Sequence, residues 1–433
     1  MKQYYLRVLL LSVLSFAGTT ETFAQFTLQG EVRPRAEFRN GFKSPNTLAT
    51  DPAFFVEQRS RLYAGYKAEK MAFRLTLQDV RIWGGANQIY KNDDPALFNV
   101  YEAWGEYFFT PQFSVRAGRQ ALDYDNARFL GDLDWAQQGR SHDAALFLYK
   151  APSGFQAHFG AAYNQSVAFE PGKLSGTYYD LANARAGGNY KTMQYLWLHQ
   201  ENDVMKASLL VHNDGRQTLD TSGVNFRQTY GLYAERKLGG LNLTGELYYQ
   251  GGKNAGGQTI SAYLAAFDAT FKTALTPLTV GVDYLSGTDA TDTKDRAFNP
   301  LYGTNHKFYG FMDYFYVGNG HQNKGLADFY VKTKFKLGKK AVLLGQLHQF
   351  NAAATVTRPA GDGSLEELSS SLGQEIDLVF NLALTEGVSL QGGYSQLFSS
   401  ASMDALKGTT SAGGNQWAWL MFTIKPTLFS SAH

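Results

Sequence analysis

Apolar and polar residues alternate along most of this 433-residue chain. Between residues 26 and 38 the even positions are mainly apolar and the odd positions are polar or charged, and residues 326–337 alternate in the same way. Since successive side chains of a strand point to opposite faces, this period of two predicts β-strands. The alternating segments run about 10 to 14 residues, longer than the five or six typical of soluble strands, which favours tilted strands that cross a bilayer.

Eighteen such segments are predicted along the chain. They lie near residues 26–39, 54–68, 71–82, 99–109, 112–122, 142–150, 154–163, 190–200, 203–213, 226–238, 240–250, 258–273, 276–287, 326–338, 340–350, 372–384, 386–398 and 415–425. Eight short turns alternate with nine longer, mostly polar loops between these segments. The turns lie near Glu69-Lys70, Thr110-Pro111, Pro152-Ser153, Glu201-Asn202, Gly239, Thr276, Gly338-Lys339 and Thr385-Glu386, and the loops near 40–53, 83–98, 123–141, 164–189, 214–225, 251–257, 288–325, 351–371 and 399–414.

Short turns on one side, long loops on the other and an even strand number are typical of bacterial outer-membrane barrels. We therefore predict an all-β fold, a closed transmembrane antiparallel β-barrel of 18 strands, with short periplasmic turns, long extracellular loops and both chain ends in the periplasm. The aromatic stretch Lys307–Tyr316 resembles a further strand, but a nineteenth strand would put the two chain ends on opposite sides of the membrane. We place this stretch inside the loop 288–325, folded against the barrel or into its mouth.

Composition supports a barrel over the other membrane and soluble classes. Charged residues make up 18% of the chain, below the roughly 25% of soluble domains, while aromatic residues make up 15%. A mean hydropathy of −0.30 excludes a helical membrane protein, whereas barrel strands alternate and so lower the average hydropathy. A soluble β-propeller or stacked sandwich is the alternative fold. It would have shorter strands and a repeat of about 40 to 50 residues, and the sequence has no such repeat.

The N-terminus predicts secretion. Lys2 and Arg7 precede an apolar run over residues 8–17, and the small-residue site Thr22-Phe23-Ala24 follows. This pattern is typical of a signal peptide at residues 1–24, cleaved after Ala24, which leaves a single barrel domain at residues 25–433. The apolar run is about half of the roughly 20 residues that a membrane anchor would need. The chain has no Cys, which excludes disulfides and thiol chemistry.

The inward face of the first five strands carries a modest excess of basic residues. The basic inward positions are Arg33, Arg35, Arg59, Arg61, Lys67, Arg74 and Arg116, and the acidic ones are Glu31, Glu37, Glu57, Glu102 and Glu106. Guanidinium groups bind carboxylates in bidentate fashion, and rings of Arg or Lys select anions in pores. This pattern predicts an anion-preferring conduit. The alternative is a structural role, because Arg–Glu ladders fill many wide lumens.

Residues 118–144 are too charged for a lipid-facing strand. The charged residues there are Arg119, Asp123, Asp125, Arg128, Asp132, Asp134, Arg140 and Asp143. We expect the loop to fold inward as a constriction. Strict alternation would put Arg119 on the lipid face, so we predict a β-bulge at that position.

The sequence gives no support for catalysis. Ser141, His142 and Asp143 are adjacent on a strand, so their side chains alternate between faces and cannot form a Ser–His–Asp relay. The eight His residues lack metal-ligand spacing, and no Gly-rich loop opens a helix to cradle phosphate. Asp289, Asp292 and Asp295 could hold Ca²⁺, but a solvated loop is favoured because six or more oxygen ligands must converge. We predict no enzymatic activity, no metal and no cofactor.

Three stretches carry a resemblance to a known family. FVEQRSRLYAGY at 55–66, the region 118–144 and FNPLYGTNHKFYGFMDYF at 298–315 resemble the alginate-export family of outer-membrane proteins, over nearly the whole mature chain. The resemblance implies a monomeric 18-stranded barrel with an arginine-lined, anion-selective lumen that exports the polyuronate alginate. It implies lumen roles for Arg59, Arg61, Arg119, Arg128 and Arg140, with Asp132 and Asp134 as acidic partners at the constriction.

The sequence therefore predicts an outer-membrane conduit for an anionic solute, an acidic polysaccharide such as alginate or its oligomers. The expected partners are outer-membrane lipid and lipopolysaccharide, the polymer itself and periplasmic export or uptake machinery, and no nucleic acid. Three alternatives remain: a general diffusion porin, an importer of another anionic solute, and a receptor or structural barrel that conducts nothing.

Overall fold

The computed structural model describes residues 24–89, 98–164, 190–218, 223–274, 276–315 and 320–431. The predicted signal peptide lies outside the described residues except for Ala24. Within the described ranges, no helix is long and apolar enough to cross a membrane.

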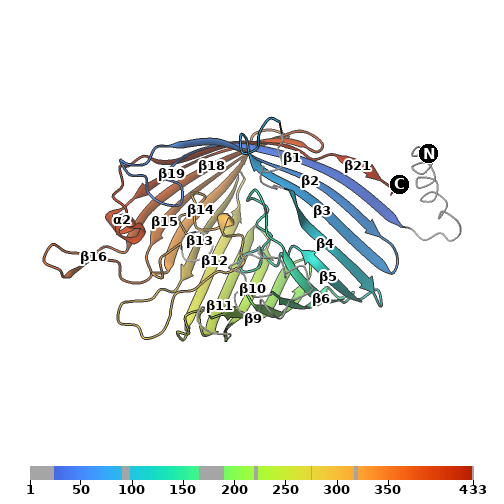
Figure 1. Ribbon diagram of the computed structural model, residues 1–433, viewed down its shortest axis with the longest axis horizontal. Coiled ribbons are helices and arrows are strands. Elements are labelled where there is room, and N and C mark those ends of the chain that lie inside the picture. Colours follow the sequence, from blue (N-terminus) through green and yellow to red (C-terminus); the bar gives the residue numbers. More distant parts are fainter. Residues whose placement is uncertain are drawn as a thin grey trace.

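Antiparallel strands form almost the whole structure (Figure 1). The strands of the large sheet are β1 Gln25–Asn40, β2 Ala53–Lys67, β3 Met71–Ile82, β4 Phe98–Phe108, β5 Phe113–Gln120, β6 His142–Lys150, β7 Phe155–Tyr163, β8 Thr192–Glu201, β9 Met205–Gln217, β10 Val224–Leu238, β11 Leu241–Gly252, β12 Ala262–Lys272, β13 Pro277–Leu285, β14 Leu326–Lys336, β15 Ala341–Asn351, β18 Ser371–Thr385, β19 Val388–Ser399, β20 Asn415–Ile424 and β21 Thr427–Ser430. Each strand lies within a few residues of a predicted segment.

The sheet closes on itself through its first and last strands. β1 pairs with β2 on one side and with β20 and β21 on the other. β20 and β21 are two parts of one strand, interrupted at Lys425 and Pro426, so the described chain forms a closed antiparallel barrel of 18 strands. Closure leaves no unpaired sheet edge, as the interior of a bilayer requires. The predicted fold is confirmed.

Three small elements lie in the loops and were not predicted. The strands β16 (Thr357–Pro359) and β17 (Leu365–Glu367) form a hairpin. The 3₁₀ helix η3 spans Asn305–Lys307, and the α-helix α2 spans Ala401–Lys407. The hydroxyl of Ser400 caps α2 by accepting a hydrogen bond from the Met403 amide. Lys407 at its other end donates hydrogen bonds to the carbonyls of Tyr314 and Gly320. The helix therefore anchors the long loop between β13 and β14.

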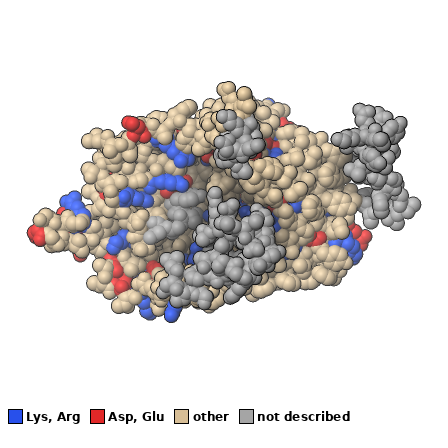
Figure 2. Space-filling view, in the orientation of Figure 1, with Lys and Arg blue, Asp and Glu red and all other residues tan. Residues whose placement is uncertain are grey.

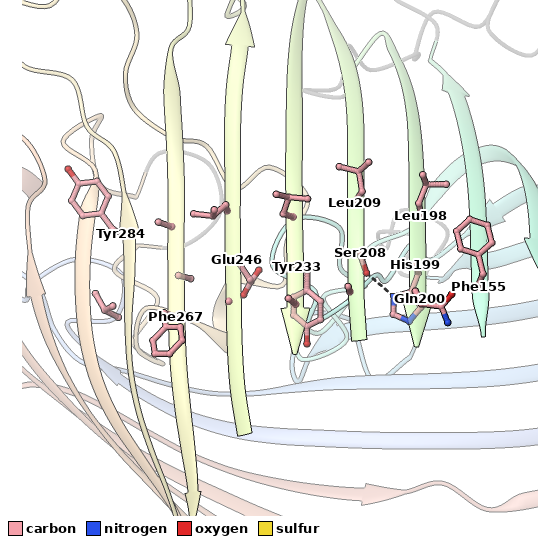
Figure 3. A pocket seen from close by; sticks show the side chains of 18 residues that line it. Phe155, Leu198, His199, Gln200, Ser208, Leu209, Tyr233, Glu246, Phe267 and Tyr284 are labelled. Atoms are coloured by element: carbon pink, nitrogen blue, oxygen red, sulfur yellow. Dashed lines mark hydrogen bonds between the residues drawn. The ribbon is translucent and has the colours of Figure 1, made fainter. Parts of the chain in front are cut away.

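Apolar side chains cover the outer face of the barrel. Large exposed apolar residues on this face include Phe73, Phe147, Leu209, Phe267, Phe329, Leu347 and Leu420. Small cross-strand neighbours, Ala207, Ala234 and Gly245, leave an apolar groove of about 870 Å³ there, flanked by Leu198 and Leu209 (Figure 3). This composition suits a lipid-facing surface.

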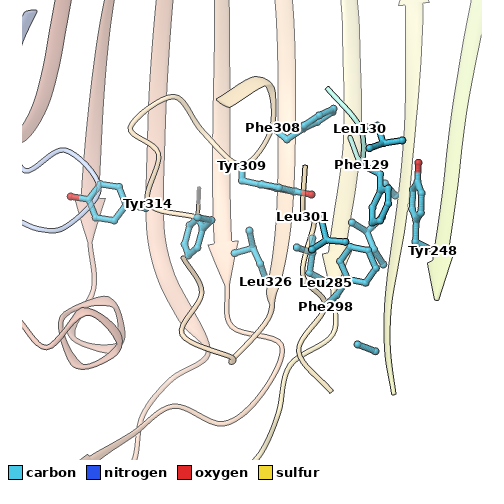
Figure 4. Close-up of a cluster of buried hydrophobic side chains, with 14 of the residues drawn as sticks. Phe129, Leu130, Tyr248, Leu285, Phe298, Leu301, Phe308, Tyr309, Tyr314 and Leu326 are labelled. Carbon is cyan, nitrogen blue, oxygen red and sulfur yellow. The ribbon is translucent and has the colours of Figure 1, made fainter. Parts of the chain in front are cut away.

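Two loop segments fold into the lumen. The first inserted segment comprises residues 121–141, and the second comprises residues 286–315. Their apolar side chains, among them Phe129, Leu130, Leu301 and Tyr309, pack against inward residues of the barrel wall (Figure 4). The aromatic stretch that begins at Lys307 thus lies in the loop and inside the barrel as far as it is described, as predicted.

Candidate functional site

Four arginines on β1 and β2 hold the first inserted segment by its backbone. Arg33 donates to the carbonyls of Asp134, Trp135 and Ala136 at 2.9, 3.2 and 3.0 Å. Arg35 donates to the Trp135 carbonyl at 3.0 Å. Arg59 and Arg61 donate to the carbonyls of Asp134 and Gln138 at 2.9 and 3.2 Å. Strand alternation directs all four guanidinium groups inward, as predicted, because the four residues share one face of the β1–β2 pair.

The carboxylate of Asp134 lies between three of these arginines. It accepts hydrogen bonds from Arg61 at 2.7 Å and from Arg59 at 3.2 Å, and Arg33 lies 3.9 Å away. The three cations hold the pKa of Asp134 well below its ordinary range, against the opposing effect of burial. The side chain of Arg59 is 1% exposed, whereas that of Asp134 is 48% exposed. While the segment is in place, these arginines are shielded and Asp134 is the group that faces open space.

Arg128 attaches the first inserted segment to the opposite wall. It donates to Glu246 on β11 at 2.9 Å and to both carboxylate oxygens of Asp283 on β13 at 2.9 and 3.0 Å. Its guanidinium lies 3.9 Å from the ring centre of Phe308. Since all these groups are buried, the carboxylates hold the pKa of Arg128 well above its ordinary value. The segment thus binds the basic wall through its own Asp134 and the acidic wall through its own Arg128.

Arg140 joins the two inserted segments. It donates to the carbonyls of Gly131 and Gly303 at 3.3 and 3.0 Å, and also to the Tyr302 carbonyl. The Gly131 amide donates to the same Tyr302 carbonyl at 2.9 Å. Asp132 was expected, with Asp134, to be an acidic partner at the constriction. Its carboxylate accepts a hydrogen bond from the backbone amide of Asp134 at 3.0 Å. The described contacts of the Asp132 carboxylate include no arginine.

The predicted bulge at Arg119 is wrong. The pairing of β5 with β4 and β6 is continuous from Ser114 to Arg119, and Arg119 lies opposite Asp143. The two side chains form an exposed ion pair of 2.9 Å on the outer face at the loop end of the strands. This pairing neutralises both charges, so no bulge is needed to turn Arg119 inward. The register shift lies instead in the neighbouring β3–β4 pair, at Thr76 and Leu77.

Arg74 and Arg116 face inward, as predicted, and they lie nearer the turns than the other four arginines. Arg116 binds Glu106 with two hydrogen bonds of 2.9 and 2.8 Å, and Arg74 lies 3.5 Å from Glu102. Both arginine side chains are about a third exposed. Unlike the four arginines that bind the first inserted segment, these two present part of their surface to the lumen.

Lysines dominate the inward positions at the turn end of the strands. Strand alternation places these basic side chains inward: Lys67, Lys150, Lys206, Lys237, Lys272, Lys334, Lys336 and Lys425. Lys206 pairs with Glu201 and Lys425 with Glu31, whereas the other six form no ion pair within the described part of the chain. The space-filling view does not distinguish these lysines from other basic residues, but it shows several Lys and Arg side chains beside a hollow near the middle of the face that it presents (Figure 2).

The residues considered for catalysis and for Ca²⁺ do not form a site. His142 and Asp143 lie on opposite faces of the strand, as predicted, with His142 inward and Asp143 outward. Asp292 binds Arg296, Asp295 binds Asn254, and Asp289 accepts from the Thr355 amide. Among the described residues, no group of three or more His, Cys, Asp or Glu side chains is arranged to hold a metal ion.

Several groups at this site were not predicted. Glu246, Asp283 and Lys334 occupy inward positions, so the alternation that located the arginines could have found them. Alternation could not have predicted that Trp135 contacts Trp419. The ring centres of the two residues lie 4.7 Å apart, and the contact joins a loop to a strand that is distant in the sequence.

A closed 18-stranded barrel with two loop segments folded into a charged lumen defines an outer-membrane channel. The fold is similar to those of OccAB4 of Acinetobacter baumannii (12% identity, TM-score 0.61, 94% of this chain and 99% of that chain) and OpdL of Pseudomonas aeruginosa (10%, 0.61, 93% and 99%). It is also similar to that of Pseudomonas aeruginosa OpdK, solved with vanillate (10%, 0.55, 92% and 98%). These low identities show the fold alone.

The sequence itself identifies the family. A comparison with curated protein sequences gives no match. The model of a family described as alginate export matches residues 24–414. The chain therefore belongs to the alginate export family, and it is a channel of the bacterial outer membrane.

Proposed function

We propose that the channel conducts an anionic solute, an acidic polysaccharide such as alginate or its oligomers. The observation that carries the proposal is the excess of unpaired lysines among the inward positions at the turn end of the barrel. Acidic inward residues there are fewer, and three of them, Glu102, Glu106 and Glu201, already pair with Arg74, Arg116 and Lys206. A lumen with this charge raises the local concentration of anions and repels cations.

The inserted segments favour a narrow path over a wide diffusion pore. The first inserted segment spans the lumen, because its Asp134 binds the arginines of one wall and its Arg128 binds the carboxylates of the other. A polymer that carries one carboxylate per sugar can pass from cation to cation along such a path, since each exposed contact is weak enough to release. A general porin would leave more of the lumen open.

Reconstitution in planar bilayers tests the proposal. We expect an anion-selective reversal potential in a salt gradient, and a loss of much of that preference in the triple variant Lys237→Gln, Lys272→Gln, Lys336→Gln. The matched control replaces Lys70, Lys294 and Lys339, which lie in turns or loops rather than on the inward face, by Gln. Cation selectivity of the native channel, or an equal effect of the two triple variants, would contradict the proposal.

Block of the current tests the nature of the solute. We expect oligouronates to block the channel more strongly than neutral oligosaccharides of equal length, because only the former carry carboxylates that the lysines attract. Equal block by both kinds of sugar would make a general porin the better account.

A further inference from the structure

A cavity of about 410 Å³ lies inside the barrel beneath the inserted segments, toward the turn end. Trp135, His306 and Phe311 of the inserted segments form one side of it. The other side comes from inward residues of five strands: Lys334 on β14, Val342 and Leu344 on β15, Val379 and Asn381 on β18, Gln391 on β19 and Trp419 on β20. Its position places it where a solute entering from the turn end first meets the inserted segments.

The aromatic side of the cavity is fixed in advance. The rings of Trp135 and His306 stack at 4.8 Å with an interplanar angle of 4°, and Phe311 stacks on His306 at 5.2 Å. Asp313 holds the His306 ring through a contact of 2.8 Å. Arg35 lies 4.4 Å from the ring centre of Trp135. Because these rings are already held, a ligand that packs on Phe311 has little ordering cost to overcome.

The opposite side offers a cation and two amides. Lys334 is exposed and forms no ion pair within the described residues. Gln391 donates a hydrogen bond to Asn381, and the two side chains keep further amide donors and acceptors. A flat apolar surface, a free ammonium and paired amides therefore face one space of about 410 Å³, within the range of small-ligand sites.

We propose that this cavity is a binding subsite for one sugar ring that carries a carboxylate. The apolar C–H face of the ring packs on Phe311, whose electron-rich face attracts polarised C–H groups. Lys334 binds the carboxylate, and Asn381 and Gln391 bind the hydroxyls. The inference rests on the proposed function, and it deepens that function by naming the residues that recognise the solute before the constriction.

Binding to the detergent-solubilised full chain tests the subsite without relying on conduction. A uronic-acid trisaccharide and maltotriose, a neutral trisaccharide, serve as calorimetric probes. We expect Lys334→Gln to weaken binding of the uronate about fivefold and to leave maltotriose unchanged, because an ion pair of this exposure contributes about 1 kcal/mol. Phe311→Ala should weaken both sugars, and Phe311→Trp should restore them. Far-ultraviolet circular dichroism of each variant verifies the barrel.

Lys336→Gln is the matched control, because it removes the same charge from the same face of β14 outside the cavity. Equal effects of Lys334→Gln and Lys336→Gln, or a Phe311→Ala variant that binds normally, would overturn the subsite. If one of these two results is found and the channel is still anion-selective, the proposed function holds and the subsite is rejected. A channel without anion selectivity whose uronate binding depends on Lys334 rather than Lys336 contradicts the proposed function and supports the subsite.

Discussion

A buried guanidinium group needs acceptors for its five donors, and in this lumen a folded-in loop supplies them. Arg59 illustrates the arrangement: its Nε donates to Glu31 at 2.6 Å, and its terminal nitrogens donate to the Asp134 carbonyl and carboxylate. A cation left without these acceptors would be costly at such depth. The arginines that the sequence suggests as solute contacts are therefore first of all the groups that position the first inserted segment.

The attachment of the first inserted segment to the arginines of β1 and β2 depends most on the carboxylate of Asp134. Asp134→Asn leaves three buried guanidinium groups with less negative charge to face, so we expect a loss of about 2 kcal/mol in the free energy of unfolding, between the values for exposed and buried ion pairs. Urea unfolding in lipid vesicles at pH 7 measures it. Asp132→Asn is the control, since the described contacts of that carboxylate include no arginine.

The same variant has a predicted pH signature. Because the arginines lower the pKa of Asp134 in the folded state, its contribution to stability is present above the ordinary aspartate pKa of about 4 and is lost as the pH falls below it. A fall in pH should therefore lower the free energy of unfolding of the native protein more than it lowers that of the Asp134→Asn variant. Parallel pH profiles of the two proteins would show that Asp134 does not carry this attachment.

At the scale of elements, the barrel wall and the inserted segments are held by different forces. Backbone hydrogen bonds between neighbours close the wall, whereas charged contacts and apolar packing hold the segments. The two ends of the first inserted segment lie close together, since Gln120 and His142 are cross-strand partners. A short linker can therefore join β5 to β6 and leave the strand pairing intact.

Replacement of residues 124–138 by a short Gly/Ser linker should give a barrel that still assembles and conducts more current. The physical reason is that the segment occupies lumen volume while the wall closes without it. Single-channel conductance measures the effect. As a control, the same linker replaces the exposed hairpin at residues 357–367, which should leave the conductance unchanged. An unchanged conductance after removal of the lumen segment would show that it does not limit the path.

At the scale of the whole molecule, the alternation of turns and loops fixes the orientation in the membrane. The strand β1 begins and the strand β21 ends at the turn end, where Thr27 pairs with Ser430. We expect added protease on intact cells to cleave the chain in the long loops, such as that between β15 and β18, and to spare the short turns, because the turns face the periplasm. Cleavage confined to the turns would reverse the topology.

The sequence by itself determined the barrel. A period of two is a local property, so each of the 18 strands could be read from its own residues to within a few residues at its ends. The same alternation fixed which side chains face inward, and so it located Arg33, Arg59 and Arg61. The prediction failed at Arg119, where we added a bulge to the pattern in order to keep a charge off the outer face. Alternation alone places Arg119 correctly on that face, and Asp143 neutralises its charge there.

Only the tertiary structure decided what those inward side chains contact. Arg59 and Asp134 are 75 residues apart and Arg128 and Asp283 are 155 apart, so their pairing depends on how two irregular segments cross the lumen. Those segments contain Ala127, Leu133 and Tyr309 with positive φ, which local preference disfavours and surrounding contacts stabilise. Repeating strands are specified residue by residue along the chain, whereas the contacts inside the barrel are specified by packing alone.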